Sequence, residues 1–207
     1  MHEPLSNPTT NHGSHFVTDL ELLFKNTFYN DYNTTLCGGA LEPEYLPADD
    51  EQLTNRLVYR EDFFASALHE IAHWCIAGAR RREQIDFGYW YEAEGRDSEK
   101  QTAFFAVEVK PQALELLFSL CAGFAFKVSA DNTGLAIDPL PFAKAVLTQA
   151  QLYCKEGMPH RAWQFCLTLI HFYQPEINAV GLAGELRQRL KLLHKSERDA
   201  QKIVGFA

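Results

Sequence analysis

The feature that most constrains the fold is an apolar segment, residues 63–76, that carries two histidines and a glutamate. Its sequence, FFASALHEIAHWCI, places His69, Glu70 and His73 among Phe, Leu, Ile, Ala and Trp. Apolar residues at this spacing predict a helix over about residues 62–79 that is buried on most sides. Imidazoles and a carboxylate on such a helix need polar partners inside the protein. The chain must therefore fold so that another element brings partners to this helix.

The two histidines form an HExxH pattern, and this pattern predicts a metal site. His69 and His73 are separated by four residues, so their side chains lie one turn apart on the same helix face. Neutral imidazole is a good ligand for zinc or iron. Glu70 lies about 100° round the helix from His69, where it can orient a metal-bound water or accept a proton. We predict His69 and His73 as metal ligands and Glu70 as a catalytic residue; the structural alternative is two hydrogen-bonded histidines at the core edge.

A third ligand has to come from another element, and the next long helix offers two glutamates. Glu108 lies in VEVKP and Glu115 in ALELLF, seven residues apart and therefore nearly in phase. A carboxylate among apolar neighbours is expensive to bury without a partner. These residues favour Glu108 slightly and leave Glu115 open. More remote candidates are His171, Asp86, Glu92 and Asp97.

Two histidines and a carboxylate suit two different chemistries. They form a catalytic zinc site with an open position, and they also form the facial triad of non-heme iron oxygenases. A zinc metallopeptidase is the alternative function, but no HxxGxxH follows the motif, and Gln112, not Asp, stands four residues after Glu108. A binding module with structural zinc would normally need four protein ligands, and only three can be assembled here.

Composition excludes several classes of protein. The chain has 207 residues, of which 46% are hydrophobic, so it can bury a core. Its net charge of −8 argues against direct binding of nucleic acid. It contains no run of 18 apolar residues, so we expect no membrane span. The first fifteen residues lack the basic and apolar regions of a signal peptide, which predicts a cytoplasmic location.

The pattern along the chain predicts an α+β fold, a predominantly helical single domain with a small β-sheet and the metal site on the HExxH helix. Residues 1–15 are predicted to be a flexible polar leader, and residues 16–207 a single catalytic domain. Pro111 is expected to kink the long helix predicted at about 98–126, or to start a new helix there. Strands are expected at about 56–60 and 84–92. Further helices are expected from Phe16 and at about 98–126, 139–156, 159–174 and 177–204.

Three segments around the motif resemble a known family. ALHEIAHWCIAGARRREQIDFGYWYEAEGRD, VEVKPQALELLF and GFAFKVSADN occur in this order and are similar to the elongation factor P hydroxylases. The resemblance covers about residues 16–175 and leaves 176–207 as a helical C-terminal extension. It implies oxygen-dependent hydroxylation of a lysine side chain of elongation factor P after β-lysyl addition. It also implies a metal ion held by His69, His73 and Glu108.

The resemblance also sets expectations for cofactors and partners. Fe(II) is the expected metal, although a purified sample can contain Zn, and O2 is the expected oxidant. No HxD…H pattern with a downstream Arg is present, so a 2-oxoglutarate clamp is not recognisable. The expected partner is β-lysylated elongation factor P, with no nucleic acid and no membrane.

A β-lysylated side chain carries amines, and a pocket for it needs carboxylates and aromatic faces. One segment after the HExxH helix supplies both. An ordinary amphipathic strand, with aromatic side chains in the core and acids in solvent, explains the same pattern. The predicted substrate-binding residues are Asp86, Tyr89, Trp90, Glu92 and Asp97.

Overall fold

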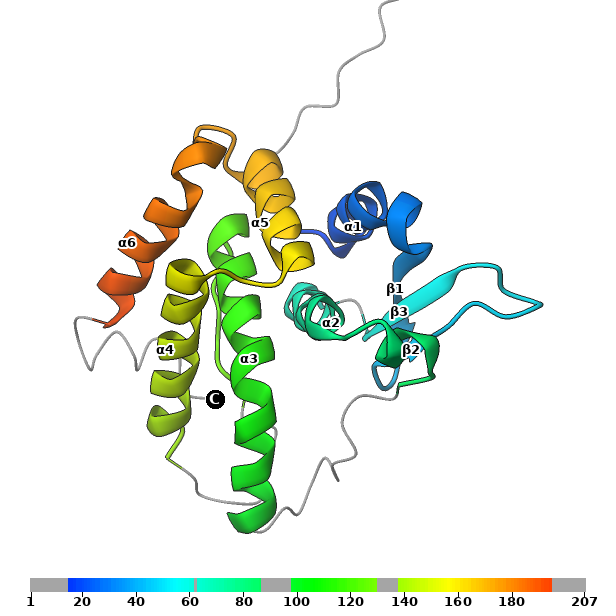
Figure 1. Cartoon of the computed structure of the whole chain (residues 1–207), viewed down its shortest axis with the longest axis horizontal. Helices are drawn as coiled ribbons and strands as arrows, with labels where there is room; N and C mark the ends of the chain where they lie inside the picture. The colour runs from blue at the N-terminus through cyan, green and yellow to red at the C-terminus, as the bar shows by residue number, and fades with distance from the viewer. Residues whose placement is uncertain (1–14, 62, 87–97, 130–137, 195–207) are drawn as a thin grey trace, which may run out of the picture.

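A computed structural model describes residues 15–61, 63–86, 98–129 and 138–194. It confirms a predominantly helical α+β fold with one small sheet (Figure 1). The strands are β1 (Thr34–Ala40), β2 (Glu44–Leu46) and β3 (Asn55–Arg60). The helices are α1 (Val17–Tyr32), α2 (Phe64–Ile76), α3 (Ser98–Ala122), α4 (Leu140–Glu156), α5 (His160–Tyr173) and α6 (Leu182–His194), with short 3-10 turns η1 (Arg80–Glu83) and η2 (Ala179–Gly181).

The sheet lies at one end of the molecule, beside α1 and α2, and has the order β1-β3-β2 (Figure 1). β1 pairs with β3 in parallel, and β2 pairs with β3 in antiparallel. The fully buried Tyr59 of β3 reaches α1, where its hydroxyl donates a hydrogen bond of 3.0 Å to Glu21. A Cβ atom at Gly38 of β1 would lie 2.6 Å from the Tyr59 ring. Glycine at position 38 therefore allows this side chain to link the sheet to α1.

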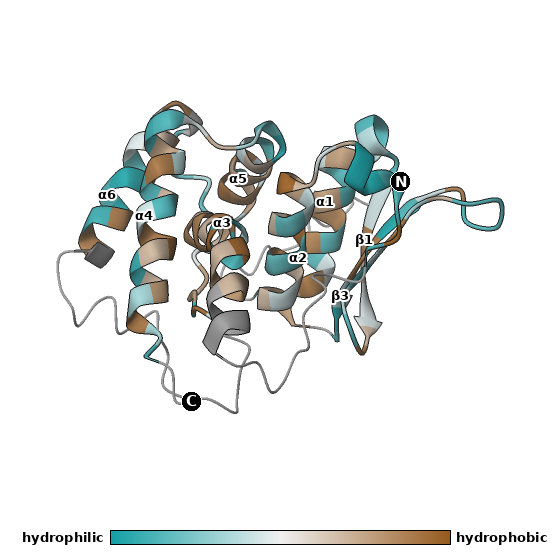
Figure 2. Ribbon diagram, turned by 60° about the horizontal axis from the view of Figure 1, so that its bottom comes forward, coloured by the Kyte–Doolittle hydropathy of each residue, from teal (hydrophilic) through white to brown (hydrophobic). Residues whose placement is uncertain are grey.

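Helix α3 is the central helix of the bundle and packs against α2, α4 and α5. In Figure 2 it lies among the other helices and carries mainly hydrophobic colours, while α6 at the edge is largely hydrophilic. One stripe of α3 is polar although it is buried. This stripe, here called the α3 polar stripe, has spacings of four, three and four residues and therefore stays on one helix face. It consists of Glu108, Gln112, Glu115 and Ser119.

Helix α2 is fixed by aromatic packing along one side and by arginine at its C-terminal end. Trp74 packs against Phe24 and Phe28, with ring centroids 5.0 and 4.8 Å apart. One Nη atom of Arg161 on α5 donates hydrogen bonds to the carbonyls of Trp74, Cys75 and Ala77, at 2.8, 3.2 and 2.5 Å. Its guanidinium lies 4.6 Å from the centre of the Trp74 ring. These contacts satisfy carbonyls that no helical N–H can reach.

Several boundaries differ from those expected. The sequence predicts loop and short strands over residues 31–61 without giving the bounds of β1. Helix α3 continues through the buried Pro111 and ends at Ala122, where Gly123 adopts a left-handed φ of 68°. In the expected strand at 84–92, Asp86 forms a single backbone bridge with Tyr45, and residues 87–92 lie outside the described ones.

The two ends of the chain lie largely outside the described residues, which start at His15 and stop at residue 194. His15, assigned above to the leader, donates a hydrogen bond of 2.8 Å from Nε2 to the carbonyl of Ala122 and stacks on Tyr173. Of the helix expected at 177–204, the structure describes η2 and α6, and residues 195–204 lie outside the described ones. Within the described residues, none of the helices has both the length and the apolar character needed to cross a bilayer.

Candidate metal centre

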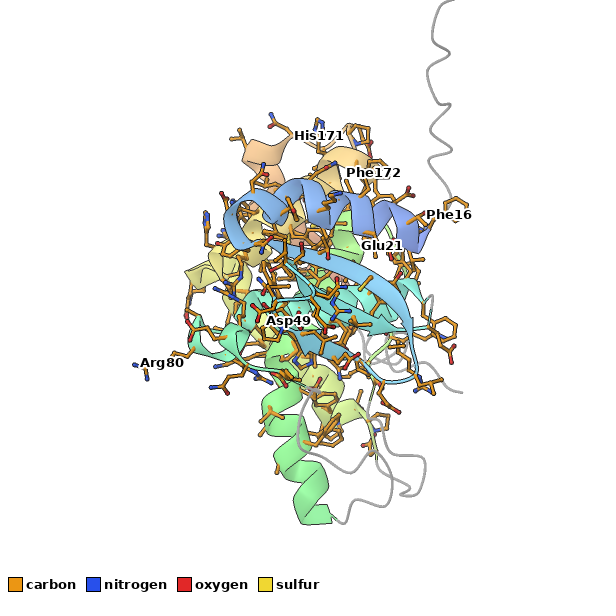
Figure 3. All side chains as sticks on the ribbon, turned by 90° about the vertical axis from the view of Figure 1, so that its right-hand side faces the viewer. Phe16, Glu21, Asp49, Arg80, His171 and Phe172 are labelled. Carbon is orange, nitrogen blue, oxygen red and sulfur yellow. The ribbon has the colours of Figure 1, made fainter. Side chains whose placement is uncertain are left out.

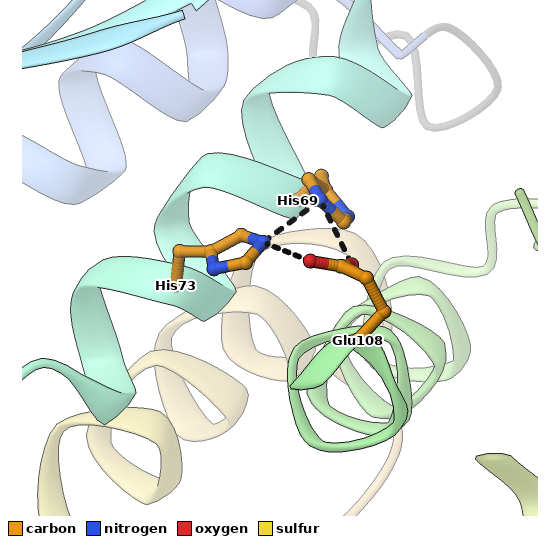
Figure 4. Close-up of side chains that lie close together, drawn as sticks. All are labelled: His69, His73 and Glu108. Carbon is orange, nitrogen blue, oxygen red and sulfur yellow. Dashed lines mark hydrogen bonds and ion pairs between the residues drawn. The ribbon is translucent and has the colours of Figure 1, made fainter. Parts of the chain in front are cut away.

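Helices α2 and α3 pack side by side, and three of their side chains converge at one point (Figure 4). The Nε2 atoms of His69 and His73 are 3.0 Å apart. The carboxylate of Glu108 approaches both of them, with one oxygen 3.5 Å from His69 Nε2 and the other 3.3 Å from His73 Nε2. The i, i+4 spacing on α2 therefore places the two imidazoles on the face that meets α3, as the HExxH pattern predicts.

The chemistry of this donor set fits a divalent cation. Each of the three groups can offer a lone pair to the same point, and their ligand atoms lie within 4.8 Å of one another. Ligand atoms about 2.1 Å from one ion lie roughly 3.0–3.4 Å apart in octahedral or tetrahedral coordination. The two Nε2 atoms are 3.0 Å apart, within this range, and each lies 3.3–3.5 Å from a different oxygen of Glu108. Two imidazoles and one carboxylate suit both zinc and non-heme iron.

The two glutamates that the sequence left open occupy different places around His69. Glu108 is 2% exposed and faces the Nε2 atoms of both histidines. Glu115 lies two turns further along α3, where one carboxylate oxygen is 2.8 Å from Nδ1 of His69. The structure thus groups Glu108, and not Glu115, with the two histidines as a set of potential metal ligands. Glu115 contacts the opposite side of the same imidazole ring.

Charges crowd this site because two histidines and three glutamates share it. Burial alone would lower the pKa of His69, but the hydrogen bond and charge of Glu115, with the charges of Glu108 and Glu70, raise it to about 10. Burial raises the pKa of Glu70, which His69 and His73 partly counteract. Burial would also raise the pKa of Glu108, but the hydrogen bond with His73 and the charges of both histidines lower it. The site therefore holds excess negative potential, which favours a bound cation.

Gln112 connects the site to the segment that follows α3. Its amide nitrogen donates to the carbonyl of Ser129 at 2.8 Å, and its amide oxygen accepts from the Ser129 N–H at 3.0 Å. The same nitrogen lies 3.5 Å from Glu108 Oε2. The sequence pattern alone indicates no role for Gln112. A polar residue four positions after Glu108, in an otherwise apolar helix, was the available signal.

The structure describes only one of the five predicted substrate-binding residues. Asp86 pairs through its backbone with Tyr45, and its carboxylate forms an ion pair with the guanidinium of Arg81. Of the remote ligand candidates, His171 is exposed on α5 (Figure 3) and is not part of the group formed by the two α2 histidines and Glu108. The remaining predicted residues lie outside the described ranges: Tyr89, Trp90, Glu92 and Asp97.

Fold and site together define a mainly helical α+β protein with a candidate two-histidine, one-glutamate metal centre between two packed helices. A sequence model of elongation factor P hydroxylase matches residues 23–181, a range that includes both helices. The chain is also 47% identical over 163 residues to the elongation factor P lysine hydroxylase of Haemophilus influenzae. That alignment covers 78% of this chain and 92% of its relative. The chain therefore belongs to the elongation factor P hydroxylase family, as the sequence segments indicated.

Proposed function

We propose that this protein is an oxygen-dependent hydroxylase that acts on the β-lysylated lysine of elongation factor P. The observation that carries the proposal is the convergence of His69, His73 and Glu108 in a chain of this family. Hydroxylation replaces a C–H bond by C–OH with one oxygen atom of O2. The second oxygen atom leaves as water, with two protons and two electrons from an external two-electron donor.

The three converging residues would hold an iron(II) ion, and zinc would fit the same atoms in a purified sample. When bound, the iron supplies the activation of O2 that a C–H hydroxylation needs. The protein holds both imidazoles by their place on a buried helix and holds Glu108 within reach of both. Glu70, next to His69 and also half-buried, would orient a water molecule or hold a proton beside the reacting atoms.

The charge of the site supports a cationic substrate. Glu70, Glu108 and Glu115 together carry up to three negative charges, and a divalent ion neutralises two of them. The surplus favours a side chain with amine groups, such as β-lysyl-lysine. We propose that further contacts with the substrate side chain come from the segment that joins the two ligand-bearing helices in sequence. The residues proposed there are Tyr89, Trp90, Glu92 and Asp97. Asp86 contributes less directly, because its carboxylate pairs with Arg81.

Partner and location follow from the proposed substrate. Elongation factor P in its β-lysylated form is the proposed protein partner, and the cytoplasm is the proposed location. The net charge of −8 favours recognition of the modified protein over direct contact with RNA.

The test is the intact mass of β-lysylated elongation factor P after co-expression with the wild-type protein or with the His69→Ala variant. We expect a gain of one oxygen atom with the wild type and none with the variant. Ser119→Ala, on the same α3 polar stripe but outside the group of three ligands, is the matched control and should act as the wild type. An unchanged mass with the folded, iron-loaded wild type would contradict the proposal. Peptide cleavage that depends on zinc and on Glu70 would instead favour the metallopeptidase alternative.

A further inference from the structure

The imidazole of His69 is held on both of its nitrogen atoms. Nε2 faces His73 and Glu108, at 3.0 and 3.5 Å. Nδ1 lies 2.8 Å from the carboxylate of Glu115, which is only 7% exposed. The two nitrogens are therefore in different environments, one at the convergence point of the ligands and one against a single buried acceptor.

We propose that Glu115 is a positioning residue that orients His69 for metal binding without itself being a ligand. This inference rests on the proposed metal centre. A carboxylate acceptor at Nδ1 favours the tautomer with its proton on Nδ1, which leaves the lone pair on Nε2. Nε2 is the atom that faces Glu108 and His73. The hydrogen bond also fixes the ring plane and makes the imidazole a more basic ligand.

The surroundings of Glu115 favour this role over a purely structural one. Its neighbours Leu114, Leu116 and Leu117 are all essentially unexposed. Burial of a carboxylate at such a position is costly. A buried ion pair with histidine is often no more stabilising than a well-packed apolar side chain. An apolar side chain would fill the same space at lower cost. In the structure, this carboxylate contacts His69, which an apolar side chain could not do in the same way.

The experiment measures the affinity of the full-length protein for Co²⁺ after removal of bound metal with a chelator. The visible absorption of bound Co²⁺ reports its coordination, and competition titrations give the dissociation constant. We expect Glu115→Ala to bind Co²⁺ roughly 10- to 100-fold more weakly, the range found when partners of metal ligands are removed. Glu115→Gln keeps an oxygen acceptor for Nδ1–H, so it should restore part of the affinity and most of the wild-type spectrum.

The matched control is Ser119→Ala, one turn further along the α3 polar stripe. The Ser119 hydroxyl is buried and has no hydrogen-bond partner within the described part of the chain, so its removal should leave Co²⁺ binding unchanged. Chemical unfolding of the metal-free variants separates loss of affinity from loss of fold. If Glu115→Ala does not fold, the isosteric Glu115→Gln carries the test, with an expected several-fold loss.

Three outcomes would overturn the inference. Wild-type affinity and spectrum in both Glu115 variants would show that the contact does not position the ligand. Unaltered Co²⁺ binding in Glu108→Ala, with complete loss in both Glu115 variants, would make Glu115 the ligand. Failure of the wild-type protein to bind Co²⁺, Zn²⁺ or Fe²⁺ would reject the proposed metal centre itself. The first outcome leaves that centre in place, and the second keeps its two histidines but replaces Glu108 by Glu115.

Discussion

Helix α2 carries two polar clusters that differ in how donors and acceptors are matched. At its C-terminal end, the Arg161 guanidinium donates to three backbone carbonyls and lies over the Trp74 ring. In its middle, His69 and His73 meet Glu108, and three groups that can accept protons or cations point to one place. The end cluster pairs a cation with acceptors. The middle cluster gathers groups that can each offer a lone pair to a metal ion, and in the metal-free protein a proton on His69 offsets part of their negative charge.

This difference separates a structural role from a functional one. Buried polar groups that stabilise a fold are paired within the protein. A set of acceptors that converges at one point is costly unless a cation joins it. We therefore expect changes at the end of α2 to alter stability, and changes in its middle to alter metal binding.

The largest expected effect separates the clusters directly. His73→Ala removes one converging lone pair, so its affinity for Co²⁺ should fall by more than about 100-fold, beyond the range for partners of ligands. The free energy of unfolding of the metal-free variant should fall by about 1–2 kcal/mol, because the buried Glu108 loses its hydrogen bond with His73. Co²⁺ titration and urea unfolding measure the two quantities. Wild-type affinity in this variant would remove His73 from the site.

Arg161→Ala should have the opposite profile. It removes hydrogen bonds from a charged donor and a contact with Trp74, so we expect a loss of about 2–3 kcal/mol in the free energy of unfolding. Co²⁺ affinity of the folded variant should be unchanged. Arg161→Lys, which keeps the charge, should lose less stability. A parallel fall in Co²⁺ affinity would show that the two clusters depend on each other.

A rise in pH should strengthen metal binding and lower the stability of the metal-free protein. The pKa of His69 in the metal-free protein is raised from 6.5 to about 10 by Glu115, Glu108 and Glu70 against the effect of burial. A metal ion needs the neutral ring, so Co²⁺ affinity should rise about tenfold per pH unit between pH 7 and 9. The stabilising proton on His69 is fully bound below about pH 6.5 and lost toward pH 10, so the metal-free protein should become less stable over that range.

Calorimetric Co²⁺ titrations in buffers of different ionisation enthalpy provide a second measurement of this proton. They should show release of about one proton per ion bound at pH 8. Affinity that is independent of pH in this range would show that His69 is already neutral in the metal-free protein.

The smallest expected effect concerns Gln112, whose substitution should change both stability and metal affinity, each only slightly. Gln112→Met keeps the length of the side chain but loses both hydrogen bonds with Ser129, which should cost about 1–2 kcal/mol of stability. Because the contact with Glu108 is long, at 3.5 Å, Co²⁺ affinity should change by less than about tenfold. Urea unfolding and Co²⁺ titration again measure both. A loss of affinity larger than that of Glu115→Ala would place Gln112 among the residues that position Glu108.

Helical periodicity in the sequence was sufficient to predict the main helices, but it could not predict contacts between distant segments. Strand β1 contains Gly38 and Gly39 and pairs in parallel with β3, about twenty residues away, so no local pattern indicates it. Pro111 favours a break in an isolated helix. Packing of α3 against three other helices outweighs this local preference.

For the candidate site too, the sequence was sufficient for the local spacing but not for contacts between distant segments. The HExxH spacing places His69 and His73 on one face whatever the rest of the fold does. Glu108 and Glu115 are nearly in phase, so the sequence indicates that both can face α2. Which side of the His69 ring each one meets depends on how far α3 is displaced along α2. That displacement is a property of packing, which the sequence does not show.

All three converging groups belong to two helices that pack directly on each other. A displacement of α3 by one turn, about 5.4 Å, would bring Gln112 to the place of Glu108. The geometry of the site is therefore sensitive to small displacements of α3 along α2. Substitutions in the core far from the site, which move α3 by fractions of an ångström, should become visible as changes in the colour of bound cobalt before they become visible in stability.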